Sequence, residues 1–197
     1  MMFGLAITRR RIVASAGAVS ALVLGLAVWG GPASASAPAS GPDADAIRGV
    51  VTRALHLLQE ESLPPATYNG GPMSDQLRAQ MSAKAMAQAG QLFSGRGLSW
   101  FENVVKYNLD EQASGEIRHM GGGVSRIAFT SITISGDQAT AAVTEDVWAD
   151  VAQVQQSGKT AVAHPKNTML ASLILQRVDG KWYVVDYRAK FAAGSEP

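Results

Sequence analysis

The last third of the chain alternates apolar and polar residues with a period of two. Three runs, at 124–135, 138–155 and 168–191, show this pattern and are rich in Val, Ile, Thr and aromatic residues. Such alternation is typical of strands with one buried face. Gly136-Asp137 separates the first two runs and Asp179-Gly180 divides the third, and both pairs favour hairpin turns because Gly and Asp tolerate positive φ. The pattern therefore predicts antiparallel strands joined by hairpins.

The first run changes parity in its middle. Ile127 and Phe129 share one parity, whereas Ile132 and Ile134 share the other. A β-bulge near Thr130-Ser131 would return all four side chains to one face and would bend the sheet. We therefore expect a curved sheet whose concave face is covered by apolar side chains.

The residues before the strands show helical periodicity. Apolar residues recur at helical spacing through 45–61, and the hydroxyl of Ser74 can cap a second helix. Ser99 and Glu102 fit a capping box at the start of a third helix. The glycines at 121–123 are interpreted as a turn between the helical and strand halves. The predicted fold is α+β, with N-terminal helices packed on a curved antiparallel sheet.

The N-terminus has the features of an export signal. Basic residues within 8–11 precede an apolar segment at 12–29, and Ala33-Ser34-Ala35 resembles a cleavage site. We expect residues 1–35 to be a signal peptide that directs the chain out of the cytoplasm, by the Sec or the twin-arginine route. If the leader were not cleaved, its apolar segment would be long enough to anchor the chain in a membrane.

The remainder of the 197-residue chain is expected to form a single domain. The expected division is a flexible spacer at 36–44, the domain at 45–191 and a tail at 192–197. There is no cysteine, so the apolar core must stabilise the domain without disulfides. Without the three arginines of the leader, 14 basic residues face 16 acidic ones, a balance that gives no electrostatic case for nucleic-acid binding.

Candidate functional residues are few, and they form no catalytic signature. The three histidines lack the spacing of a metal site and no sulfur ligand exists, so we expect neither a metal nor a cofactor, and we assign no catalytic residue. Aromatic, acidic and histidine side chains of the third helix and the strands are the candidates for a pocket or binding surface. These are Trp100, Tyr107, His119, Asp146, Trp148, Asp150, Asp186 and Tyr187.

The carboxylates of the second run allow two interpretations. Glu145, Asp146 and Asp150 cluster there, and both aspartates share parity with Trp148, opposite to Val147 and its row. If the valines face the core, the aspartates face solvent. If instead the sheet curls so that the aspartates line its concave side, burial would raise the pKa of one of them and suit it to act as a base.

The order of elements resembles that of the nuclear transport factor two-like superfamily, also called SnoaL-like or cystatin-like cones. The resemblance rests on the helix at 46–58, the strand start at Gly122-Gly123-Val124, and the hairpins at 136–140 and 179–186, and it covers roughly 45–191. The chain is also similar in style to exported Mce-associated proteins of that superfamily. The resemblance implies a cone-like fold; because the superfamily includes ketosteroid isomerases, dehydratases, secretion-system subunits and plain binding domains, it leaves the activity open.

Three functions are compatible with these observations. The leading hypothesis is an exported, non-enzymatic domain that binds a small apolar ligand or a protein partner. The alternative is a small isomerase or dehydratase with a buried Asp base in the cone. The candidate bases are Asp146, Asp150 and Asp186, and the candidate hydrogen-bond donors are Tyr107, His119 and Tyr187. A third is a homodimer that closes the cone opening. A deep pocket with a carboxylate beside Tyr or His would favour the enzyme, whereas a filled cone would favour binding through the outer sheet face.

Overall fold

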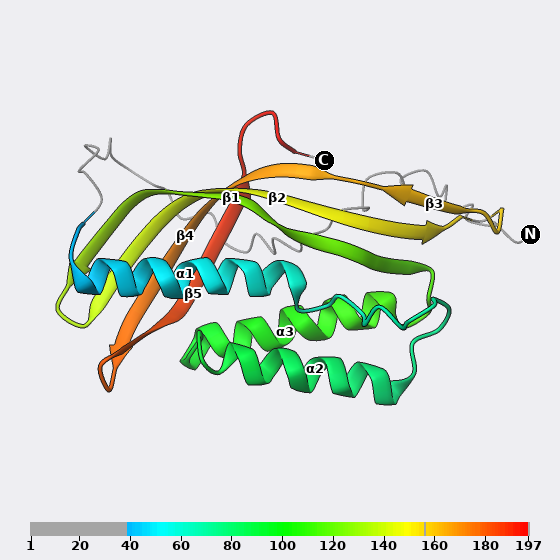
Figure 1. The fold of residues 1–197 in the computed structure, drawn as a ribbon, viewed down its shortest axis with the longest axis horizontal. Coiled ribbons are helices and arrows are strands. Elements are labelled where there is room, and N and C mark those ends of the chain that lie inside the picture. The colour runs from blue at the N-terminus through cyan, green and yellow to red at the C-terminus, as the bar shows by residue number, and fades with distance from the viewer. Residues whose placement is uncertain (1–38, 156, 197) are drawn as a thin grey trace, which may run out of the picture.

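The computed structural model describes residues 39–155 and 157–196, so the expected signal peptide lies outside the described residues. Within them, three helices precede five strands. The helices are α1 (Pro42–Glu60), α2 (Asp75–Ala89) and α3 (Gly95–Gln112), and the strands are β1 (Ile117–Ser135), β2 (Gln138–Val154), β3 (Thr160–Ala163), β4 (Lys166–Val178) and β5 (Lys181–Phe191). All three helices lie on one side of a single curved antiparallel sheet (Figure 1). The predicted α+β architecture is therefore confirmed. None of the described helices is both long and apolar enough to cross a membrane.

The sheet has the strand order β1-β2-β4-β5, and β3 pairs with the far end of β2. β4 pairs with β2 from Gln138 to Trp148, and β3 continues along the same edge from Val151 to Val154. The two strands are separated at His164-Pro165, where the Pro165 carbonyl still accepts a hydrogen bond from the Ala149 N–H. The sequence analysis did not predict β3, because four largely exposed residues carry no burial pattern.

The predicted bulge in β1 is confirmed. Phe129 pairs with Val143 and Ser131 pairs with Ala142, so Thr130 is the extra residue. Two further register shifts lie nearer the start of the strand, between residues 119 and 121 and between 124 and 126. Each bulge increases the local twist and bends the strand, which explains the curvature of the sheet around α1.

Both predicted hairpin turns are present. Asp179 and Gly180 have φ values of 50° and 77°, as a two-residue turn between right-twisted strands requires, and Gly136 has a φ of 57°. The expected cap of α2 is also present, since the Ser74 hydroxyl accepts a hydrogen bond from the Leu77 N–H.

The glycines at 121–123 do not form a turn, and that prediction was wrong. They lie inside β1, which begins at Ile117 rather than at Val124. A Cβ at Gly123 would lie 3.1 Å from Trp148 Nε1, and a Cβ at Gly122 would lie 2.9 Å from the Gln59 carbonyl oxygen. Glycine is present here because other groups approach the strand closely, which is a second common reason for glycine in a strand.

The capping box predicted at Ser99 and Glu102 was also wrong. α3 begins at Gly95 with Ser94 as its N-cap, so Ser99 lies in the second turn. There the Ser99 hydroxyl donates a hydrogen bond to the Gly95 carbonyl, as serine often does within a helix.

Apolar side chains fill the space between the helices and the sheet. Phe93 and Phe101 stack with ring centroids 5.1 Å apart, and both are fully buried. The other large buried side chains in this core come from α1, α3 and the inner rows of β4 and β5: Ile47, Val51, Leu55, Val105, Leu173, Leu175, Trp182 and Val184. The concave face of the sheet is therefore largely occupied by the protein's own side chains.

Candidate functional site

The structure divides the candidate residues between the two faces of the sheet. Tyr187 contacts Trp100 of α3 on the inner face, whereas Asp146 and Asp150 belong to the row of β2 opposite to its buried valines. The row containing Val143 and Val147 is buried, which agrees with the first interpretation of the strand carboxylates.

The residue of that inner row that the sequence analysis did not single out is Glu145. Its side chain is only 1% exposed, and its Oε1 accepts a hydrogen bond of 3.2 Å from the Tyr187 hydroxyl. Its Oε2 has no hydrogen-bond partner among the described residues. The signal was available in the sequence, because Glu145 has the same parity as Val143 and Val147.

Burial changes the ionisation of both groups. It raises the pKa of Glu145 to about 7 from an ordinary value of 4.5, and the hydrogen bond from Tyr187 only partly offsets this. Burial and the neighbouring carboxyl also raise the pKa of Tyr187 well above 10. Trp100 packs on Tyr187 with ring centroids 5.1 Å apart. The Glu145 carboxyl can give up or take a proton near pH 7, and the Tyr187 hydroxyl donates a hydrogen bond to it. This pair is therefore the strongest candidate for chemistry on the inner face.

A second buried polar cluster surrounds His119 at the far end of the helices. Asn108 donates a 2.6 Å hydrogen bond to Glu61, and burial raises the pKa of Glu61 to about 7. Gln112 donates to the Ser62 carbonyl and accepts from the His119 N–H, and the Ser62 hydroxyl lies 3.0 Å from His119 Nδ1. Burial lowers the pKa of His119. These bonds join the end of α1 to α3 and β1, so the cluster has a structural role.

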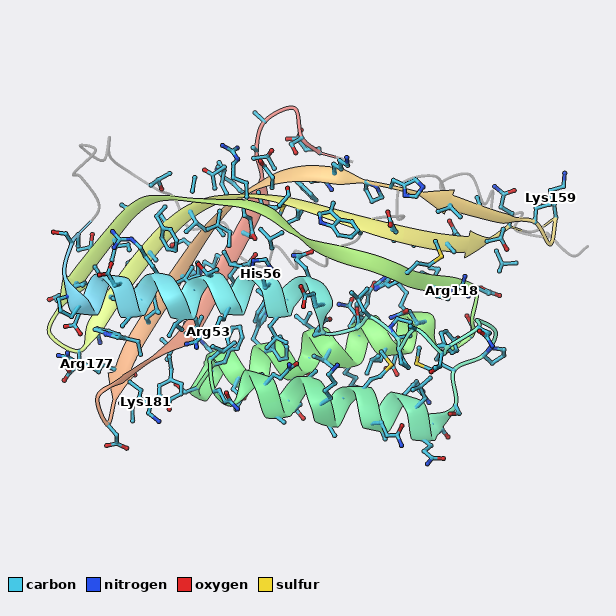
Figure 2. All side chains as sticks on the ribbon, in the orientation of Figure 1. Arg53, His56, Arg118, Lys159, Arg177 and Lys181 are labelled. Atoms are coloured by element: carbon cyan, nitrogen blue, oxygen red, sulfur yellow. The ribbon has the colours of Figure 1, made fainter. Side chains whose placement is uncertain are left out.

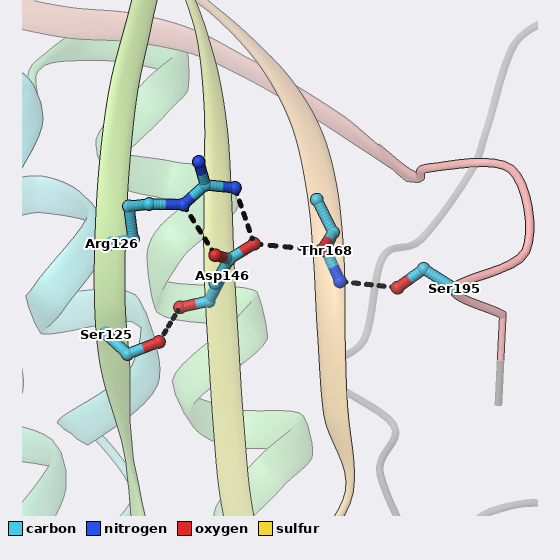
Figure 3. A network of polar contacts seen from close by, with 5 residues as sticks. All are labelled: Ser125, Arg126, Asp146, Thr168 and Ser195. Atoms are coloured by element: carbon cyan, nitrogen blue, oxygen red, sulfur yellow. Dashed lines mark hydrogen bonds and ion pairs between the residues drawn. The ribbon is translucent and has the colours of Figure 1, made fainter.

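Asp146 is held in a surface network on the outer face (Figure 3). Arg126 Nε donates to Asp146 Oδ2 at 2.7 Å, and the Thr168 hydroxyl donates to Oδ1 at 2.9 Å. The hydrogen bond from Arg126 lowers the pKa of Asp146, with Thr168 adding to the effect. The Thr168 N–H donates to the Ser195 hydroxyl, which fastens the C-terminal residues to β4. A carboxylate held in its charged form is a poor base, so Asp146 does not fit the role of a buried Asp base.

Asp150, Asp186 and Tyr107 also lie outside an enclosed pocket. Asp150 Oδ1 is 2.6 Å from His164 Nδ1, and Asp186 Oδ2 is 3.1 Å from Arg96. Tyr107 is 49% exposed. Asp186 therefore has an ionic partner and Asp150 lies beside a histidine, and none of the three candidate aspartates in the described part of the chain is buried.

The residues of this network line an open hollow on the outer face. Trp148 also lines it, together with the polar side chains of Asp150, His164, Lys166 and Asn167. Among the described residues, no three His, Asp or Glu side chains are grouped so that they could hold a metal ion.

The outer face of β4 carries an exposed apolar stripe. Leu170, Ile174 and Val178 point away from the helices and are 40%, 39% and 44% exposed. Their neighbours across β2 are small or β-branched, since Leu170 pairs with Thr144 and Ile174 pairs with Thr140. We call Leu170, Ile174 and Val178 the outer stripe.

Comparisons with known proteins gave similarity in structure only. No protein-family model matches the chain, and no curated protein sequence matches it. The intermembrane-space region of the chloroplast protein ARC6 is 15% identical with a TM-score of 0.49, over 78% of this chain and all of the other. An NTF2-like protein with a cystatin-like fold from Novosphingobium aromaticivorans is 14% identical with a TM-score of 0.39, over 78% and 84%. CagV from Helicobacter pylori, a VirB8 homologue, is 10% identical with a TM-score of 0.41, over 75% and 98%. At these identities and TM-scores the similarity concerns the fold alone.

Proposed function

We propose that this chain is an exported, non-enzymatic domain that binds a protein partner through the outer face of its sheet. The observation that carries the proposal is the outer stripe. Three large aliphatic side chains stand in one row of β4, each about two-fifths exposed, with Ser172 and Gln176 between them in that row. Groups of exposed apolar side chains, unlike single ones, are a feature of protein-binding surfaces.

The filled inner face supports the same proposal. Phe93, Phe101 and Trp182 occupy the concave side beneath α1 and α3, where a small apolar ligand would otherwise be expected to bind. A protein partner on the outer face requires no rearrangement of this core. The export part of the proposal rests on the leader at 1–35, which the structure does not describe.

A photo-crosslinking experiment tests this proposal. A photoreactive residue replaces Ile174 in the outer stripe or, as a control, the exposed Lys84 on α2, and the cells that make the protein are irradiated. We expect a discrete covalent adduct at position 174, its loss when Leu170→Glu is added, and no such adduct at position 84. Equal labelling at both positions, or no adduct at 174, would contradict the proposal.

Glu145 and Tyr187 favour a second candidate function, an isomerase or dehydratase with Glu145 as its base. It is supported by the 3.2 Å contact and by a pKa near 7, which suits proton transfer. This candidate requires that the core open beside Trp100 to admit a substrate. Glu145→Gln should abolish such an activity, whereas a domain that only binds through the outer stripe should keep its full function.

A further inference from the structure

We propose that the free edge of β3 pairs with the β3 edge of a second copy of this chain, in antiparallel register centred on Val162. This inference is independent of the outer stripe and of the proposed partner. It rests on the hydrogen-bonding groups, side chains and position of one short strand.

The edge of β3 that faces away from β2 has free backbone groups. Gln155 N–H donates to the Lys159 carbonyl and Ala149 N–H donates to the Pro165 carbonyl, so the backbone carbonyls of residues 159 and 165 point toward β2. Because the direction alternates along a strand, Thr160, Val162 and His164 point their N–H and C=O groups the other way. β2 is the one partner of β3 among the described strands, and these groups form no backbone hydrogen bond within the described residues.

The other edges of the sheet are interrupted or covered in part. β1 carries three register shifts, which disturb the regular row of groups that a new strand would need. β5 is covered near Val184, whose N–H and C=O bond to Leu92 and Ser94. β4 is covered where β5 ends, because Ala192 N–H donates to the Thr168 carbonyl and the Ser195 hydroxyl accepts from Thr168. Within residues 39–155 and 157–196, nothing covers β3 in this way, and the strand itself contains no charged residue and no proline.

The β3 edge is complementary to itself. If two copies pair about Val162, each Val162 lies opposite the other, and Thr160 lies opposite His164 of the second copy. Thr160, Val162 and His164 then exchange backbone hydrogen bonds with the second copy. Ala161 lies opposite Ala163, so no two like charges face each other and no bulky side chains collide. Val162 is 48% exposed, and Val162 of the second copy would cover it.

The position of β3 allows a second copy to approach. Lys159 marks the tip of the β2–β3 hairpin, which extends beyond the helices at one end of the molecule (Figure 2). Pairing would join the two sheets end to end. Since only four residues form the edge, the contact is small compared with stable interfaces, and the dimer should be weak and dependent on concentration.

The absence of cysteine from the sequence permits a register-specific test. Directly opposed, hydrogen-bonded residues in an antiparallel pair have Cα atoms about 5.5 Å apart, within the range of a disulfide. Val162→Cys should therefore form a disulfide-linked dimer under mild oxidation. Thr160→Cys, two residues away, should form a disulfide-linked dimer at least about tenfold more slowly. Thr160 of the second copy would lie about four residues away along the strand.

A mixture of two variants tests the direction of pairing. Thr160→Cys and His164→Cys should crosslink to each other readily, although neither crosslinks well with itself. In sedimentation experiments the unmodified chain should dimerise as its concentration rises, and Val162→Asp, which places two carboxylates opposite each other, should remain monomeric. Equal crosslinking at positions 160 and 162, no crosslinking at 162, or a Val162→Asp variant that still dimerises would overturn the proposal.

Discussion

The Tyr187 hydroxyl donates a 3.2 Å hydrogen bond to the Glu145 carboxyl, joining β5 to β2 beneath the indole of Trp100. The glutamate occupies a position in a row that otherwise holds Val143 and Val147. A charged group at such a site is costly, so the carboxyl is held mainly in its neutral form up to about pH 7. This relationship contributes to the dependence of the domain's stability on pH.

The first prediction is that the domain loses stability as pH rises from 5 to 8. The pKa values of Glu145 and Glu61 are raised from 4.5 to about 7 in the folded chain, so the folded state binds protons more tightly than the unfolded state. Their stabilising contribution is complete below about pH 4.5 and is lost as pH rises through 7. Each loss amounts to at most about 3 kcal/mol. Urea unfolding of the unmodified chain at pH 5 and pH 8 measures the total.

Substitution separates the contributions to this pH dependence. Glu145→Gln should remove a substantial part of the loss but not all of it, because burial also raises the pKa values of Glu61 and Glu111. His119 has the opposite sign, because its lowered pKa causes stability to be lost as pH falls below about 6.5. If Glu145→Gln has the same pH dependence as the unmodified chain, the carboxyl is not buried as described.

The second prediction concerns the contact between α3 and β5. A Cβ at Gly97 would lie 2.5 Å from the Val184 carbonyl oxygen. Because the backbone fixes both atoms, no side-chain rotation can relieve this contact. Gly97→Ala should therefore lower the free energy of unfolding by about 1–3 kcal/mol, since the helix must move off the strand. Gly49→Ala on α1 is the matched control, because a Cβ there meets nothing within 4 Å.

Glycine in a helix interior is intrinsically unfavourable, so Gly49→Ala should raise stability by about 0.5–1 kcal/mol. Chemical denaturation of both variants measures whether each substitution raises or lowers the free energy of unfolding. Equal effects at the two positions would mean that α3 does not pack this closely on β5.

The third prediction concerns a surface cluster that ties α1 to two hairpins. Arg177 Nη1 lies 3.0 Å from Asp43, Arg177 Nε lies 2.8 Å from Asp137, and the guanidinium lies over the Trp182 ring at 5.3 Å. Because Arg177 is about one-third exposed, Arg177→Met should lower the free energy of unfolding only slightly. A double-mutant cycle with Asp43→Asn should give a small coupling energy that shrinks in high salt. A coupling that does not respond to salt would show that packing on Trp182, rather than charge, dominates.

The periodic parts of the fold were predictable from the sequence. The helix at 45–61, the bulge at Thr130-Ser131 and the turn at Asp179-Gly180 each follow from a local rule that the tertiary structure does not override. They are predictable because burial on one face, or positive φ at one position, restricts the choice of residue.

Features that depend on distant contacts were not predictable in the same way. The glycines at 121–123 look like a turn, and only the positions of Trp148 and Gln59 explain why they lie in a strand. Similarly, the partners of Asp146 and Asp150 lie on other strands or in the loop before β4, so their surface roles follow from the assembled sheet.

The candidate site was predictable in part. Trp100 and Tyr187 were expected among the binding residues, and the structure brings them together. Their buried partner Glu145 was not predicted, although the alternation of β2 places it on the same side as Val143 and Val147. Sequence parity thus locates a buried acid, but it does not reveal which side chain on another strand bonds to it.

The central claim is that function resides on the outer face of the sheet rather than inside the cone. The most direct measurement is the yield of the crosslinked adduct at position 174 in two backgrounds, Leu170→Glu and Glu145→Gln. We predict that Leu170→Glu reduces the yield at least tenfold and that Glu145→Gln leaves it unchanged. The reverse result, an adduct insensitive to Leu170→Glu and lost with Glu145→Gln, would contradict the claim and assign function to the interior.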